Sequence, residues 1–84
     1  MNYHEALGRY TELCEQLAAE KVKRHALLHN LGVQAGQAAS AAGPRSYLEL
    51  EALLDGAREA DEKITGARAA LAEVAAICNK PVPR

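Results

Sequence analysis

Apolar residues recur at alternating spacings of three and four along the second half of the chain. Beginning at Leu50, this spacing selects only apolar residues as far as Cys78. They are Leu50, Leu53, Ala57, Ala60, Ile64, Ala67, Leu71, Val74 and Cys78. The repeat is typical of the a and d positions of a coiled coil, and it predicts a long amphipathic helix. We refer to such a series as a seam.

The first half carries a similar seam with a polar interruption. Its members are Tyr3, Leu7, Tyr10, Cys14, Leu17, Lys21, Arg24, Leu28, Leu31, Ala35 and Ala38. The two polar members, Lys21 and Arg24, could fix register at a cost in stability. The favoured interpretation is different: an α-helix has 3.6 residues per turn, so the apolar stripe drifts and the two side chains lie at its edge.

The clearest break in the pattern is the segment SAAGPRS, residues 40–46. Gly43 is expected to end the first helix in a left-handed conformation, and Pro44 cannot continue a helix. At the other end of the chain, Pro81 and Pro83 predict that the second helix ends near Asn79.

Two capping boxes mark the expected helix starts. Asn2 is followed three residues later by Glu5, and Ser46 is followed at the same spacing by Glu49. In each pair the first side chain caps the helix and the glutamate reaches back toward the cap residue.

These signals predict an all-α fold, a long antiparallel helical hairpin that resembles a coiled coil. Residues 1–84 form a single helical domain with a helix over 3–41, a turn at 42–46, a second helix over 47–79 and a frayed tail at 80–84. Two alternatives stay open, because Gly32 could end the first helix and Gly56 could split the second. A continuous first helix is favoured, since residues 33–42 are rich in alanine and contain no proline.

A single hairpin of this composition has little apolar surface that its two helices can bury. Each alanine-rich seam removes one narrow stripe from water, which is less than the ordering of two long helices requires. Two cysteines do not form a dense disulfide framework, so oligomerisation is the expected remedy. The simplest closed arrangement is a four-helix bundle homodimer. In an antiparallel dimer, Tyr47 at one turn would meet Tyr3 and Tyr10 of the other chain.

Charge and targeting signals narrow the classes of function. The net charge of −1 argues against a dedicated nucleic-acid-binding protein, which usually carries a basic excess. The start of the chain lacks the basic and apolar regions of a signal peptide, and no run reaches the length of a membrane span. We expect a cytoplasmic protein with reduced thiols and no membrane association. Its alanine-rich, arginine-containing composition points to a GC-rich bacterial or phage genome.

The segment KRHALLHN places His25 and His29 four residues apart, on one helical face. Two such histidines could bind a metal, but the glutamate of the H-E-x-x-H motif is missing, so neither a metal nor another cofactor is expected. Together with Lys21, Lys23 and Arg24 they form a basic face. If residue x of the first helix lies beside residue 87 − x, this face meets the acidic residues of the second helix, and internal charge pairing is favoured over recognition of a partner.

No arrangement of residues indicates an enzyme. The chain has no Gly-rich phosphate loop and no Ser-His-Asp set, and Cys14 and Cys78 are assigned to core packing without a histidine beside them. The favoured function is a small non-enzymatic helical protein-interaction module: an adaptor, inhibitor or accessory regulator, phage- or plasmid-borne. Its candidate partner-binding residues are Lys21, Lys23, Arg24, His25 and His29. The alternatives are a nucleic-acid-binding helical dimer that uses the same face, and a metal-binding helical bundle.

Overall fold

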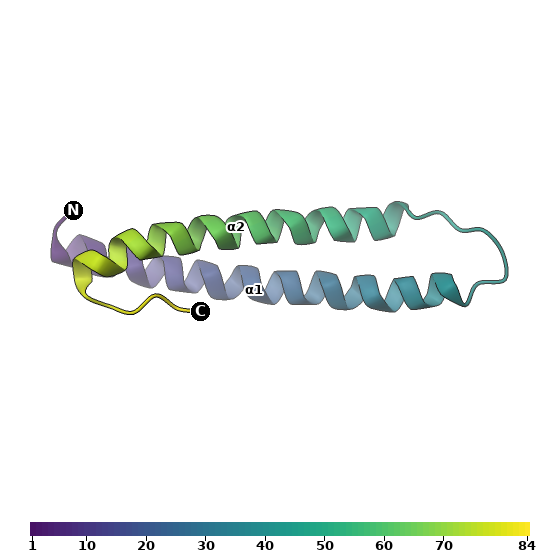
Figure 1. The fold of residues 1–84 in the computed structure, drawn as a ribbon, viewed down its shortest axis with the longest axis horizontal. Helices are drawn as coiled ribbons and strands as arrows, with labels where there is room; N and C mark the ends of the chain where they lie inside the picture. The colour runs from purple at the N-terminus through teal and green to yellow at the C-terminus, as the bar shows by residue number, and fades with distance from the viewer.

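The computed structural model describes residues 1–84 and contains two helices and no strand. Helix α1 spans Tyr3–Ala39 and helix α2 spans Leu48–Cys78. They lie side by side in opposite directions in a rod of 61 × 15 × 13 Å (Figure 1). The N-terminus and the end of α2 lie at one end of the rod, and the C-terminal tail turns back so that Arg84 lies beside Lys21 of α1. The predicted all-α helical hairpin is confirmed. Neither helix contains an apolar stretch long enough to cross a membrane.

Both helices are uninterrupted, so the alternatives that break α1 at Gly32 or α2 at Gly56 are wrong. Gly56 instead allows a close approach between the helices. A Cβ atom at this position would lie 3.2 Å from Cδ1 of Leu27. Glycine has a low helix propensity, but at this position it leaves room for Leu27 where α1 packs closely on α2.

The start of α1 follows the sequence prediction. The Oδ1 atom of Asn2 accepts a hydrogen bond from the backbone N–H of Glu5 at 2.8 Å. The Nδ2 atom of Asn2 donates to Oε1 of Glu5 at 3.1 Å, so the glutamate reaches the cap side chain rather than its backbone. This cap satisfies one of the free N–H groups of the first turn.

The turn differs from the prediction at both of its ends. Helix α1 ends at Ala39 instead of residue 41, and its cap residue Ser40 is right-handed. No glycine has a positive φ, so the left-handed conformation expected at Gly43 is wrong. Helix α2 begins at Leu48, one residue later than expected. The capping box of Ser46 and Glu49 does not form, because the Ser46 hydroxyl accepts from the nearby Leu48 N–H at 3.3 Å.

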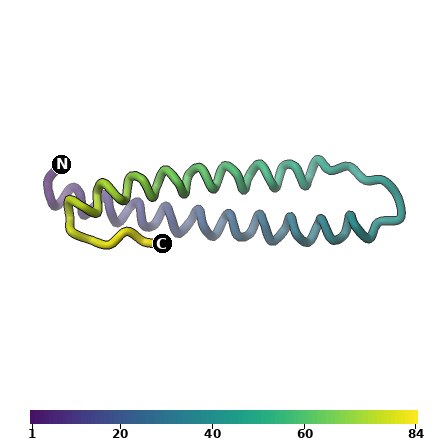
Figure 2. The backbone as a smooth tube through the Cα atoms, in the orientation of Figure 1, coloured from purple at the N-terminus to yellow at the C-terminus, as the bar shows by residue number.

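The left-handed residue of this chain is Asn79, which ends α2 at φ 53° and ψ 48°. Asparagine is enriched in this conformation among residues with a side chain. The Lys80 N–H donates to the Ala75 carbonyl at 3.0 Å, and the chain then reverses. The tail that follows runs back along α1 (Figure 2). It is held there by the Tyr10 hydroxyl, which donates to the Pro81 carbonyl at 2.7 Å.

The core follows the predicted seam of α2 closely. From Ala57 to Cys78 every seam residue is buried, whereas Leu50 and Leu53 near the turn are half-buried. On α1 the fully buried residues are Ala6, Leu13 and Leu17. Of these three, the prediction named Leu17 alone.

The observed seam of α1 therefore differs from the predicted seam at every second position. The observed series is Ala6, Tyr10, Leu13, Leu17, Glu20, Arg24, Leu27, Leu31, Gln34 and Ala38. It keeps half of the predicted positions and replaces Leu7, Cys14, Lys21, Leu28 and Ala35 by the residue before each. The apolar stripe of α1 is wide enough for two contacts. One edge packs on α2, and the other edge, from Tyr10 to Lys21, lies under the tail.

Two ion pairs and one close approach give the register of the hairpin. Arg24 lies beside Asp61, Glu20 lies beside Lys63, and Leu27 packs against Gly56. Residue x of α1 thus lies close to residue 84 − x of α2, since these pairs sum to 85, 83 and 83. The expected relation of 87 − x is corrected by about one turn of helix.

Candidate basic site on helix α1

The five predicted partner-binding residues lie in the middle of α1, but they do not share one face. An open surface hollow of about 500 Å³ is lined by Lys21, Arg24, His25, Leu28 and His29. We call it the basic hollow. Lys23 is outside it, because two residues along a helix correspond to a rotation of about 200°. The structure thus brings four of the predicted residues together and separates the fifth.

The two histidines project from α1 with parallel rings. Their ring centroids are 6.3 Å apart and their planes differ by 15°. Both side chains are exposed. No group of three or more His, Cys, Asp or Glu residues lies close enough to hold a metal ion. Two imidazoles alone supply half of the ligands of a four-coordinate structural zinc site.

Arg24 is the one cation of the basic hollow that forms an ion pair. Its Nε lies 3.2 Å from Oδ1 of Asp61, and both side chains are about half exposed. Such a pair contributes about 0–1 kcal/mol to stability. The predicted pairing of the basic run with the acidic residues of α2 is therefore observed at this one residue, and Lys23, His25 and His29 form no ion pair.

Lys21 contacts the tail instead of α2. Its Nζ donates a hydrogen bond to the main-chain oxygen of Arg84, so the tail ends at the edge of the basic hollow. The lysine is half-buried between the tail and α1. An ammonium at this edge is thus already directed at an oxygen acceptor.

A largely buried carboxylate near the basic hollow was not predicted from the sequence. Glu20 takes the seam position expected for Lys21, and its side chain is only 15% exposed. Its Oε1 lies 4.0 Å from Nζ of Lys63, while its Oε2 is buried without a hydrogen-bond partner. The polar interruption of the seam is therefore carried by Glu20 and Arg24. Ala6, Leu13 and Leu27 each lie seven residues, or a multiple of seven, away from Glu20. This heptad spacing is the sequence signal that could have placed Glu20 in the seam.

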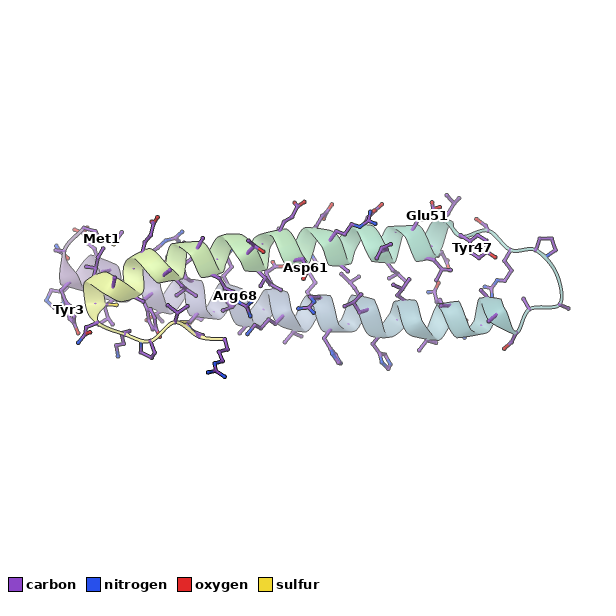
Figure 3. The ribbon with its side chains drawn as sticks, in the orientation of Figure 1. Met1, Tyr3, Tyr47, Glu51, Asp61 and Arg68 are labelled. Carbon is purple, nitrogen blue, oxygen red and sulfur yellow. The ribbon has the colours of Figure 1, made fainter.

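On α2, three residues at heptad spacing accompany the basic hollow. Asp61 reaches Arg24, and Leu54 and Arg68 lie seven residues before and after it, on the same side of the helix. Asp61 and Arg68 both project toward α1 in Figure 3. Arg68 forms no ion pair. Neither Leu54 nor Arg68 was among the residues predicted from the sequence to bind a partner.

Six leucines lie at the basic hollow or between it and the turn, and none of them is buried. We call Leu27, Leu28, Leu31, Leu50, Leu53 and Leu54 the leucine layer. Leu28 and Leu54 are each 38% exposed. In an isolated hairpin this layer keeps much of its apolar surface in water, which is unfavourable by roughly 25 cal/mol for each Å².

The two thiols belong to the packed end of the hairpin. Cys14 and Cys78 are both free, and Cys78 is buried with its Sγ donating to the Val74 carbonyl at 3.3 Å. Burial raises the pKa of the neighbouring Tyr10 phenol above its ordinary value, and a hydrogen bond with Cys14 and the charges of both thiols raise it further. Tyr10 therefore remains a neutral donor to the tail over the physiological pH range.

Comparisons with protein-family models, curated proteins and solved structures gave no match to this chain. No relative therefore lends a function to the residues of the basic hollow. What the hairpin does has to be inferred from its own surfaces.

Proposed function

We propose that the chain is a small non-enzymatic helical protein-interaction module that acts through its helix faces as an adaptor, inhibitor or accessory regulator. The single observation that carries this proposal is the leucine layer, which lies in regular helices and is left partly exposed. Exposed apolar patches of this kind mark interaction surfaces. The free thiols agree with action in the reducing cytoplasm.

The exposed area of the hairpin supports this function. Its accessible surface is 5867 Å², whereas a compact monomer of 9.0 kDa exposes about 4,900 Å². The excess of about 1,000 Å² is close to the ~800 Å² that each partner buries in a standard protein–protein interface. One interface would thus bring the chain to the surface area of an ordinary folded domain.

A second copy of the chain is the first partner that we propose. Two hairpins pack into a four-helix bundle homodimer, in which the half-buried members of the leucine layer, Leu27, Leu31, Leu50 and Leu53, gain the contacts that a single hairpin lacks. The rod shape, 61 Å long and about 15 Å wide, leaves an entire side of both helices free for such packing.

Sedimentation velocity or light scattering over a range of concentrations tests the dimer. We expect about twice the 9.0 kDa chain mass at micromolar concentration. The substitution Leu31→Glu in the leucine layer should reduce the mass to that of one chain. Val22→Glu is the matched control, because Val22 is 71% exposed and points away from α2. A stable monomer of unsubstituted chain at these concentrations would exclude the dimer.

A further inference from the structure

The two sides of the contact between α1 and α2 carry different charges. We call the side with the basic hollow the hollow side. Here α1 presents the cationic residues of the basic hollow, and α2 presents Leu54, Asp61 and Arg68. Asp61 is the single carboxylate among them and is already paired with Arg24. The hollow side is therefore net positive although the whole chain is net negative by one charge.

An apolar centre lies within this positive side. Leu28 belongs to the basic hollow, and the packing of Leu27 on Gly56 places it within about one turn of Leu54. Both leucines are 38% exposed. A centre of partly exposed leucines with a cationic rim has the composition of a protein-docking surface, with an apolar anchor point and a charged border.

A second copy of the chain does not fit on the hollow side. A two-fold interface uses the same patch of both subunits, so the cations of one hollow side would face those of the other. Like charges brought together in this way destabilise a complex. The dimer proposed above is therefore expected to form through the opposite side, where Glu20 and Lys63 lie.

A nucleic acid is also a poor occupant. The net charge of −1 gives no general attraction for a polyanion, and Leu28 and Leu54 have no apolar counterpart on a phosphate backbone. The acceptor that the structure does show at the rim is the main-chain oxygen of Arg84, which binds Lys21. The occupant that matches both features is a polypeptide with carboxylates beside an apolar residue.

We propose that the hollow side binds an acidic amphipathic helix of a partner protein. One apolar residue of that helix packs between Leu28 and Leu54, and its carboxylates face Lys21, Arg24, Arg68 and the two histidines. A carboxylate at the rim competes with Arg84 for the Lys21 ammonium, so the tail is displaced from that contact on binding. This inference rests on the proposed interaction function and specifies the chemistry of one partner, which is distinct from the second copy.

Fluorescence anisotropy with the full chain and two designed peptides tests the inference. Both peptides are helical, span about three heptads and carry the same leucines at heptad spacing, but one has glutamates and the other lysines beside those leucines. We expect the glutamate peptide to bind at least about tenfold more tightly than the lysine peptide, and its affinity to fall with added salt.

Charge reversals at two lysines locate the site. Lys21→Glu should weaken binding of the glutamate peptide by about tenfold or more. The matched control Lys23→Glu makes the same charge change on the opposite face of α1 and should alter binding less than about twofold. Circular dichroism of both variants confirms that the helices are kept, because both residues lie on the surface or at its edge.

Three outcomes would overturn the acidic helix as the occupant. Equal binding of both peptides would show that the leucines alone select the partner, and would leave the interaction function intact. Equal loss in the Lys21 and Lys23 variants would show a general charge effect. Binding of a single-stranded oligonucleotide that depends on Lys21, without binding of the glutamate peptide, would assign the hollow side to nucleic acid. The dimer is measured separately by mass, so its failure is distinguishable from all three.

Discussion

The two halves of the hairpin contain helices of the same kind but are packed very differently. We call the end where α1 begins and α2 ends the terminal half and the end with the connecting loop the turn half. The hydrophobic core cluster lies in the terminal half, within residues 6–17 and 64–78, whereas in the turn half only the small residues Ala57 and Ala60 are buried. The leucine layer, with six large apolar side chains, is in the turn half. Leucine content therefore does not explain which half has a core.

Two physical differences explain the contrast. In the terminal half, the tail lies along α1 as a third element and covers the flank from Tyr10 to Lys21, which two helices alone cannot cover. In the turn half, the seam of α1 contains Glu20, Arg24 and Gln34, whose polar groups interrupt apolar contact with α2. A helix pair acquires a core where a third layer is present and its seam is apolar.

The largest expected effect compares the same truncation in the two halves. Leu71 is fully buried, so Leu71→Ala should lower the free energy of unfolding by about 3 kcal/mol through lost burial and a cavity. Leu53 is half-buried, and Leu53→Ala should cost about 1 kcal/mol. Urea unfolding followed by circular dichroism measures both values. Equal losses at low concentration would mean that the turn half also has a core, and a Leu53→Ala loss that grows with concentration would show that a second copy covers it.

The second-largest expected effect concerns Glu20, which lies where the two halves meet. Glu20 occupies a seam position, has one buried oxygen without a partner and lies 4.0 Å from Lys63, which is a weak ion pair. Replacing a buried charge by an apolar residue is often stabilising, so Glu20→Leu should raise the free energy of unfolding by about 1–2 kcal/mol. Glu15→Leu, at an exposed position, is the control and should change it by about 0.5 kcal/mol or less. A loss of stability in Glu20→Leu would show that the pair with Lys63 contributes more than its geometry indicates.

The smallest effect tests the tail as the third element. Tyr10→Phe removes the hydrogen bond to Pro81 and should lower the free energy of unfolding by less than the change expected for Glu20→Leu, as urea unfolding would measure. Tyr47→Phe removes a hydroxyl without a partner and should lower it less still.

The pH dependence supplies a second measurement of the Tyr10 contact. Because the pKa of Tyr10 is raised in the folded chain, its contribution to stability is constant below the ordinary pKa of 10.0 and is lost as the pH rises through the folded value. Urea unfolding at alkaline pH should show this decline in the unsubstituted chain and a shallower one in Tyr10→Phe. Identical alkaline profiles would mean that the phenol does not stabilise the tail.

The helices and the main features of α2 could be predicted from the sequence. The seam of α2 is apolar without interruption, so a single phase of the repeat fits it, and the structure buries that phase. The cap at Asn2 was predictable for a local reason, since it depends on residues three apart. The turn was less predictable, because glycine adopts negative φ as readily as positive φ and the Ser46 hydroxyl can accept from more than one nearby N–H.

For the candidate site, the sequence identified the residues but not their arrangement. The spacing of four between His25 and His29 fixed a shared face. The prediction of one basic face overlooked the rotation of about 200° that separates Lys23 from Lys21. The pairing of Arg24 with Asp61, the burial of Glu20 and the contact of Lys21 with Arg84 depend on register and on the tail. Each of these joins residues that are far apart in the chain.

The sequence by itself determined two long helices, their antiparallel connection and the face of α2 that is buried, since each depends on periodicity and on local capping. The tertiary structure alone decided which edge of the wide α1 stripe meets α2. The stripe offers two seams that share half of their residues and differ by one position in the rest. The tail binds α1 at Tyr10 and Lys21, and α2 packs on the flank of Ala6, Leu13 and Glu20. Beyond Lys21 the tail no longer lies on α1, and Leu28 and the two histidines lie there in the basic hollow.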